Sequence, residues 1–174
     1  MAVVGLDFTH IDNILEALIV IAPAMVANAT PLLVKGKRPV DGGRVFLDGR
    51  RILGDGKTWE GSLAGFIAGS LTALILAALL GWEELAVIGS AASLGAILGD
   101  MAGSFIKRRL GLKRGAPAPL LDQLDFYFGA LALTVILGVD WSLKAVVEAA
   151  IVVVIAHVAS NFGAYLMGIK NVPW

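Results

Sequence analysis

The stretch SLAGFIAGSLTALILAALL, residues 62–80, contains no charged side chain. A helix that crosses the hydrocarbon core of a bilayer needs about 20 apolar residues, because it rises about 1.5 Å per residue through about 30 Å of lipid. This stretch therefore predicts a transmembrane helix. The whole chain is 57% hydrophobic and only 16% charged, with a mean hydropathy of +0.82, which favours a membrane protein over a soluble domain of the same length.

Four further apolar stretches of similar length lie along the chain. None has the regularly spaced charges of a soluble amphipathic helix. The sequence therefore predicts an all-α integral membrane protein with five transmembrane helices, at about residues 12–34, 62–80, 85–106, 120–139 and 143–167. No Lys or Arg precedes the first stretch, so we expect a retained helix there and not a secretory signal.

The basic residues indicate how these helices are oriented. Residues 35–61 contain seven Lys or Arg side chains and residues 107–119 contain five, whereas the connections on the opposite side contain only Lys144. Basic connections stay predominantly in the cytoplasm. The sequence thus predicts an N-terminus outside, a cytoplasmic C-terminus and two basic cytoplasmic segments.

The first basic segment, residues 35–61, is too long for a simple connector. Its apolar residues 45–47 and 52–53 flank Asp48-Gly49, a pair common in hairpin turns, so we expect a short β-hairpin. The sequence Gly54-Asp55-Gly56-Lys57-Thr58 follows directly. Its spacing is not that of a Walker A motif, but glycines, a lysine and a following helix are suited to binding phosphate.

Three acidic residues could carry chemistry. Asp100 follows a long apolar run, and an ionisable group at membrane depth is usually functional, although a structural ion pair with Lys107 or Arg108 is the alternative. Asp122 and Asp125 are spaced to share one helix face. We expect a Mg²⁺ ion between these three carboxylates, while simple stabilisation of a helix N-terminus is the alternative for the last two.

Other polar residues leave two interpretations open. His157 and Asn161 lie one helical turn apart within the last apolar stretch, where they could bond to Asn28 or another helix, or take part in proton transfer or substrate binding. The basic run 107–109 could anchor a helix at anionic lipid headgroups or bind a polyphosphate.

Taken together, these segments resemble the phosphatidate cytidylyltransferase superfamily, and specifically its archaeal branch, the CDP-archaeol synthase family. The resemblance covers nearly the whole chain. It is carried by Ala27-Asn28-Ala29-Thr30-Pro31, by Pro39-Val40-Asp41-Gly42-Gly43, by residues 46–59, and by the stretch from Gly99-Asp100 through Ser104, the basic run and Pro117 to Asp125. Two departures from the broader superfamily are Gln123, where its signature has Arg, and residues 115–119, which replace a His-Gly-Gly element.

The resemblance implies a single transmembrane cytidylyltransferase domain over residues 1–174, in the cell membrane with its active site facing the cytoplasm. The implied reaction transfers CMP from CTP to an isoprenoid ether-linked glycerol phosphate, with Mg²⁺ as cofactor and pyrophosphate as the second product. We expect Asp100, Asp122, Asp125 and Lys57 to be catalytic, and the three aspartates to bind the metal. The expected substrate-binding residues are Asn28, Asp41, Gly54, Asp55, Gly56, Thr58, Ser104, Lys107, Arg108 and Arg109.

Two other functions, a CDP-alcohol phosphatidyltransferase and a small transporter, are the alternatives to this one. A CDP-alcohol phosphatidyltransferase would carry D-G-x-x-A-R followed by G-x-x-x-D-x-x-x-D, whereas the close acidic pair here is spaced D-x-x-D. A small ion- or proton-coupled transporter could use Asp100 and His157, but its polar groups should extend across both leaflets. Lys plus Arg and Asp plus Glu number 14 each, so no net charge points to nucleic acid.

Overall fold

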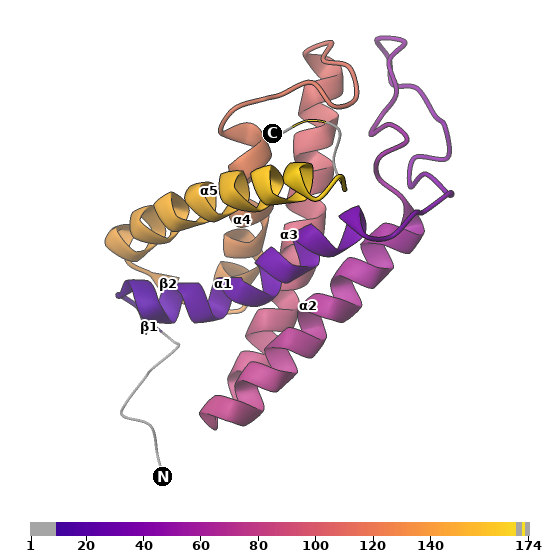
Figure 1. The fold of residues 1–174 in the computed structure, drawn as a ribbon. Coiled ribbons are helices and arrows are strands. Elements are labelled where there is room, and N and C mark those ends of the chain that lie inside the picture. Colours follow the sequence, from indigo (N-terminus) through magenta and orange to yellow (C-terminus); the bar gives the residue numbers. More distant parts are fainter. Residues whose placement is uncertain (1–9, 170–171, 173–174) are drawn as a thin grey trace.

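The protein, described by a computed structural model over residues 10–169 and residue 172, is built almost entirely of helices (Figure 1). Residues 1–9, which contributed to the prediction of a retained first helix, lie outside the described part. The α-helices are α1 (Ile14–Ala29), α2 (Trp59–Leu80), α3 (Glu83–Arg109), α4 (Leu121–Ile136) and α5 (Leu143–Leu166). A 3₁₀ helix, η1 (Thr30–Leu32), extends α1, and the two-residue strands β1 (His10–Ile11) and β2 (Asp140–Trp141) form a parallel pair.

The prediction of a mainly helical membrane protein is confirmed. Among the described residues, α1 with η1, α2, α3 and α5 are long and apolar enough to cross a membrane. Helix α4 has 16 residues and is about 24 Å long, which is shorter than a hydrocarbon core of about 30 Å. The helix positions agree with the predicted ones to within a few residues, apart from α1, whose α-helical part ends at Ala29.

Helix α3 lies at the centre of the fold and packs against α1, α2 and α4 (Figure 1). Glycines make its contact with α4 unusually close. A Cβ atom on Gly129 would lie 2.1 Å from the carbonyl oxygen of Gly95, and one on Gly99 would lie 2.2 Å from that of Asp125. Small residues let helix backbones approach in this way inside a membrane, where no hydrophobic effect drives helices together. This contact, called the α3–α4 seam, is formed by Gly95, Gly99 and Gly103 of α3 and by Gly129 of α4. It sets the distance between the two helices.

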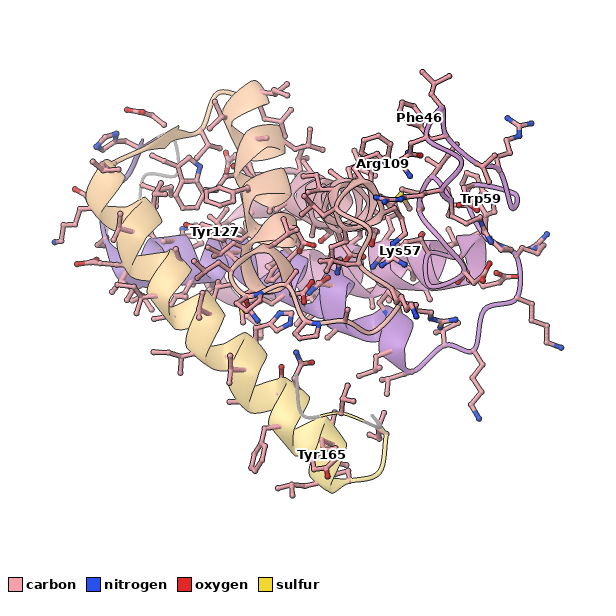
Figure 2. The ribbon with its side chains drawn as sticks, turned by 90° about the horizontal axis from the view of Figure 1, so that it is seen from above. Phe46, Lys57, Trp59, Arg109, Tyr127 and Tyr165 are labelled. Carbon is pink, nitrogen blue, oxygen red and sulfur yellow. The ribbon has the colours of Figure 1, made fainter. Side chains whose placement is uncertain are left out.

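The fully buried residues of helix α5 all lie in its first half. Its buried residues are Ala145, Ala149 and Val153, and the Tyr127 hydroxyl of α4 donates a 2.8 Å hydrogen bond to the carbonyl of Val146. After His157, which still contacts Phe126 of α4, the helix diverges from the bundle, with Tyr165 near its far end (Figure 2). The second half of α5 exposes apolar side chains, as expected of a helix surface that faces lipid.

The predicted hairpin is confirmed in a short form. Val45 and Arg51 form an isolated antiparallel bridge, and the turn closes with the Gly49 N–H donating to the Phe46 carbonyl at 2.9 Å. Gly49 has a φ of +74°, a conformation that glycine adopts without strain. The pairing of β1 with β2 was not predicted, because two residues are too few to show a strand pattern.

We predict that Gly129→Ala will destabilise the protein by about 1–3 kcal/mol, because the added methyl group must push α3 and α4 apart. Thermal unfolding in detergent measures the effect. Gly163→Ala on α5 is the matched control, since its Cβ would meet nothing within 4 Å. Equal unfolding temperatures for the two variants would contradict the account of the seam.

Candidate active site

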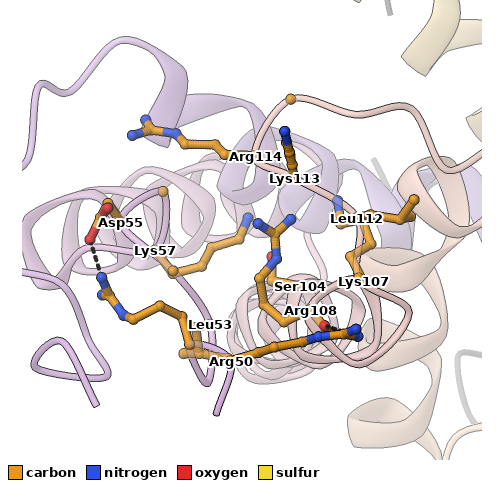
Figure 3. A pocket seen from close by; sticks show the side chains of 15 residues that line it. Arg50, Leu53, Asp55, Lys57, Ser104, Lys107, Arg108, Leu112, Lys113 and Arg114 are labelled. Atoms are coloured by element: carbon orange, nitrogen blue, oxygen red, sulfur yellow. Dashed lines mark hydrogen bonds and ion pairs between the residues drawn. The ribbon is translucent and has the colours of Figure 1, made fainter. Parts of the chain in front are cut away.

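A cavity of about 540 Å³ opens where the segment before α2 meets the end of α3 (Figure 3). Its walls come from residues 50–57, from the last turns of α3 and from the connection between α3 and α4. Seven basic side chains and a single acidic one line it: Arg50, Arg51, Lys57, Lys107, Arg108, Lys113 and Arg114, with Asp55. Such a concentration of positive charge is suited to binding a multiply charged anion.

Four of these cations are already engaged. Lys57 forms an ion pair with Asp100, and Lys107 pairs with Asp122 at 2.5 Å. Arg51 pairs with Asp41 and Asp55 at 2.6 Å each, while the Arg50 guanidinium donates to backbone carbonyls at the end of α3.

The remaining cations, Arg108, Lys113 and Arg114, form no ion pair within the described part of the chain. The buried Nε atom of Arg108 also has no hydrogen-bond partner there. The side chains of Arg108 and Lys57 extend toward the same part of the cavity (Figure 3). These uncommitted donors make this the place where an anion can gain the most from binding.

Asp41 fixes the shape of the loop that carries Lys57. Its side chain, only 1% exposed, accepts hydrogen bonds from the backbone N–H groups of Gly43, Leu53 and Gly54 at 2.9–3.0 Å, and from Arg51. Burial alone would raise the pKa of Asp41, but the hydrogen bonds from Arg51 and these amides outweigh it and hold the pKa well below its usual range. Asp41, predicted to bind substrate, does not line the cavity and instead orders the loop.

The membrane-side wall of the site is acidic. The α3–α4 seam brings Asp125 against α3, where a Cβ atom on Gly103 would lie 2.1 Å from its Oδ2 atom. Asp100 lies one helical turn before Gly103 on the same face of α3, so the carboxylates of Asp100 and Asp125 lie near each other, with Lys57 paired to Asp100. Asp122 lies apart from this pair, because it binds Lys107 and accepts a 2.8 Å hydrogen bond from the Ala118 N–H.

The predicted site of three aspartates around one metal ion is therefore not assembled. Across residues 10–169 and 172, no three acidic or histidine side chains gather closely enough to hold a metal. Asp100 and Asp125 do fit a Mg²⁺ ion, because magnesium commonly takes one or two carboxylates and completes its shell with substrate phosphates and water. Binding of Mg²⁺ at this pair remains a prediction.

The other predicted residues divide into those at the site and those that hold it together. Gly54, Asp55, Gly56, Ser104, Lys107 and Arg108 line the cavity. Asn28 and Thr58 line a smaller one of about 30 Å³ that also touches Lys57 and Asp100, although the Thr58 hydroxyl caps α2 by accepting from the Gly61 N–H at 3.2 Å. Arg109, predicted to bind phosphate, lies outside both cavities because its guanidinium is bound to the hairpin.

Four basic cavity residues were not among the predicted ligands: Arg50, Arg51, Lys113 and Arg114. In the sequence, all four count as charges that orient the helices, and Arg50 and Arg51 also belong to the expected hairpin. Their position in the same two basic segments as the predicted ligands was the signal that could have identified them. His157 stacks on Phe126, which follows Asp125, with ring centroids 6.1 Å apart, so it contacts α4 next to the acidic pair.

The site thus defines a class of protein: a membrane protein with a strongly cationic cavity beside helices that are long and apolar enough to cross a bilayer. A model of the CarS-like family, described as CDP-archaeol synthase, matches residues 10–174. The CDP-archaeol synthase of Aeropyrum pernix is 60% identical over 95% of both chains, and that of Hyperthermus butylicus is 48% identical over 92% of this chain and 96% of its own. A solved structure, described as an intramembrane enzyme for archaeal membrane lipids biosynthesis, is 58% identical, with a TM-score of 0.86 over 90% of this chain and 99% of that one.

The chain therefore belongs to the CDP-archaeol synthase family. The resemblance noted from the motifs is confirmed, and it extends across the fold.

We predict that Asp41→Asn will remove part of the acid sensitivity of the protein. Because the pKa of Asp41 is lowered on folding, its contribution to stability is complete above the unfolded-state value of about 3.9 and is lost as the pH falls below it. Unfolding temperatures measured between pH 2 and 7 should thus differ most between variant and parent near neutral pH. A constant difference over this range would contradict the role assigned to the carboxylate.

Proposed function

We propose that the protein transfers CMP from CTP to an isoprenoid ether-linked glycerol phosphate, unsaturated archaetidic acid, giving CDP-archaeol and pyrophosphate. The observation that carries the proposal is the cavity with three uncommitted cations, adjacent to an acidic pair at the end of membrane helices. A triphosphate can enter such a cavity from water, while a lipid phosphate can reach the same place with its chains still in the bilayer. Family membership supports the same reaction.

In this reaction an oxygen of the lipid phosphate attacks the α-phosphorus of CTP. A new O–Pα bond forms, the bond between Pα and the bridging oxygen to the β-phosphate breaks, and that oxygen leaves with pyrophosphate. The nucleophile is already anionic, so no side chain needs to remove a proton. Catalysis then depends on orientation and on neutralising charge.

The side chains divide this work by position. Arg108, Lys113 and Arg114 would bind the β- and γ-phosphates and stabilise the leaving pyrophosphate. Lys57, on the ordered loop beside Asp100, would orient the α-phosphate between the two substrates. Asp100 and Asp125 would hold Mg²⁺, which when bound supplies further neutralisation of phosphate charge.

We also propose that all five helices cross the membrane and that the cavity opens on the cytoplasmic side. Helix α4 is short, but it packs along α3 throughout the seam and is continued by apolar residues 137 and 139. Both cavity-forming segments are the basic ones, which is the arrangement expected of cytoplasmic connections.

Neither alternative function fits these features as well. A CDP-alcohol phosphatidyltransferase would consume a CDP-lipid and release CMP. The family to which this chain belongs is instead named for the synthesis of a CDP-lipid, CDP-archaeol. A transporter requires polar groups across both leaflets, but the described acids of the site and the cationic cavity gather at one end of α3. Ion flux into liposomes without CTP would favour the transporter.

The proposed reaction is tested by incubating the purified protein in lipid with Mg²⁺ and CTP labelled at either the α- or the γ-phosphate. Ether- and ester-linked glycerol phosphates are offered side by side. We expect lipid product labelled from the α-position only, with the ether substrate preferred. Label from the γ-position, or no lipid product at all, would overturn the proposal.

We predict that Asp100→Asn will abolish CMP transfer, because it removes a metal-binding carboxylate and the partner of Lys57. Unfolding temperature and elution volume should show that the variant is still folded. Asp140→Asn is the matched control, since this carboxylate is 73% exposed and pairs with His10 away from the cavity. Near-normal transfer by the Asp100 variant would exclude the assigned role.

The orientation can be tested cleanly because the chain contains no cysteine. We predict that Lys37→Cys will react with an impermeant maleimide only after the cells are opened, since residue 37 lies in a basic connection. Glu84→Cys, at the opposite end of the helices, should react in intact cells. The reverse pattern would show that the cavity faces outward.

A further inference from the structure

The hairpin around Asp48-Gly49 is fastened to the last turn of α3 by Arg109. Its Nη1 atom donates to the Asp48 carboxylate at 2.9 Å, and its Nη2 atom donates to the carbonyls of Arg51 at 2.6 Å and Arg50 at 3.3 Å. Only its Nε atom has no partner in the described part of the chain. The guanidinium thus donates three hydrogen bonds to the hairpin.

Two aromatic rings enclose the same guanidinium. Its Cζ atom lies 4.8 Å from the ring centroid of Phe46, in the hairpin, and 4.8 Å from that of Phe105, in α3. The two rings meet edge to face, with centroids 5.3 Å apart. Phe46 and Arg109 lie close together in Figure 2. A flat cation that stacks on rings and donates in several directions is a property of arginine that lysine cannot reproduce.

Arg50 makes the reverse connection, from the hairpin to the helix. Its Nη1 atom donates to the carbonyls of Arg109 at 2.6 Å and Arg108 at 3.4 Å, in the last turn of α3. The Arg108 carbonyl also accepts from the Gly111 N–H at 3.1 Å, so the short hydrogen bond to the Arg109 carbonyl is the main connection. Gly111 leaves room for it, because a Cβ there would lie 3.1–3.3 Å from the guanidinium. Arg50 and Arg109 therefore connect the hairpin and the end of α3 in both directions, and their contacts are together called the lock.

The lock continues directly into the cavity wall. Arg50 and Arg51, whose carbonyls Arg109 holds, both line the cavity, and Arg51 connects through Asp41 to the loop of Gly54. Arg108, the neighbour of Arg109, faces this wall from α3. The spacing between the two walls is consequently determined by contacts of a residue that does not itself reach the cavity.

We propose that Arg109 is a positioning residue for CMP transfer, which holds the hairpin wall of the cavity at the distance from Arg108 that CTP requires. The proposal rests on the proposed function, since it concerns how that same cavity binds its nucleotide. It assigns no contact between Arg109 and substrate. Loosening the lock should weaken nucleotide binding while leaving the acidic pair and Lys57 able to support the reaction.

The test compares Arg109→Lys with the unmodified full-length protein in lipid. Amide hydrogen exchange without CTP reports the hairpin through Phe46 and Ile52, whose N–H groups donate to the carbonyls of Arg50 and Arg44. We expect these amides to exchange faster, the KM for CTP to rise at least about tenfold, and kcat to stay within about threefold. Arg44→Lys is the matched control, because this arginine lies outside both cavities and its side chain forms no ion pair within the described part of the chain. It should change none of these values.

A second variant covers the case in which Arg109→Lys does not fold. Asp48→Asn weakens one contact of Arg109 and should shift exchange and KM in the same direction by less. Faster exchange with an unchanged KM would show that the lock is only structural and would overturn the proposal, as would unchanged exchange, or a loss of kcat with KM unaltered. If the unmodified protein does not transfer CMP, the proposed function fails and this proposal falls with it, whatever the exchange data show.

Discussion

A carboxylate placed near the end of an apolar helix must be compensated, and the ion pair between Asp100 and Lys57 meets this requirement. The two residues come from different parts of the chain, so the pair can form only if the segment before α2 is held over α3. Asp41 orders that segment through three backbone amides, and Thr58 caps α2 immediately after Lys57. The ordering of the loop, the start of α2 and the ion pair between Lys57 and Asp100 therefore depend on one another.

The membrane helices contribute to the site through their spacing. Glycines at 95, 99 and 103 on α3 and at 129 on α4 allow a backbone separation that larger residues would prevent. That separation brings Asp125 against the face of α3 that carries Asp100, and these two carboxylates are the pair to which the proposed function assigns Mg²⁺. In that proposal, the seam that stabilises the bundle also holds the metal site together.

The sequence was most informative where its pattern was long. Apolar runs of about 20 residues located the helices, and the positions of the basic residues located both segments that form the cavity. The strands β1 and β2 were missed because each has only two residues and their pairing joins opposite ends of the chain. Asp122 and Asp125 were grouped from their spacing, but the spacing could not reveal that Lys107 holds one of them away from Asp100.

Adjacent residues posed a further limit. Successive side chains on a helix point about 100° apart, so Arg108 and Arg109 must face different parts of the structure. Which one faced the cavity depends on the rotation of α3, which is fixed by packing and not by local sequence. The structure resolves the ambiguity, with Arg108 in the cavity wall and Arg109 in the lock to the hairpin.

In the proposed reaction, a soluble nucleotide and a membrane-bound phosphate meet beside the Lys57–Asp100 pair. An experimental structure of the protein with CTP and Mn²⁺, located by its anomalous scattering in place of Mg²⁺, tests this most directly. The account predicts the triphosphate within hydrogen-bonding distance of Lys57 and Arg108, with the metal ion between Asp100 and the phosphates. A triphosphate bound outside this cavity, or a metal ion remote from Asp100, would contradict it.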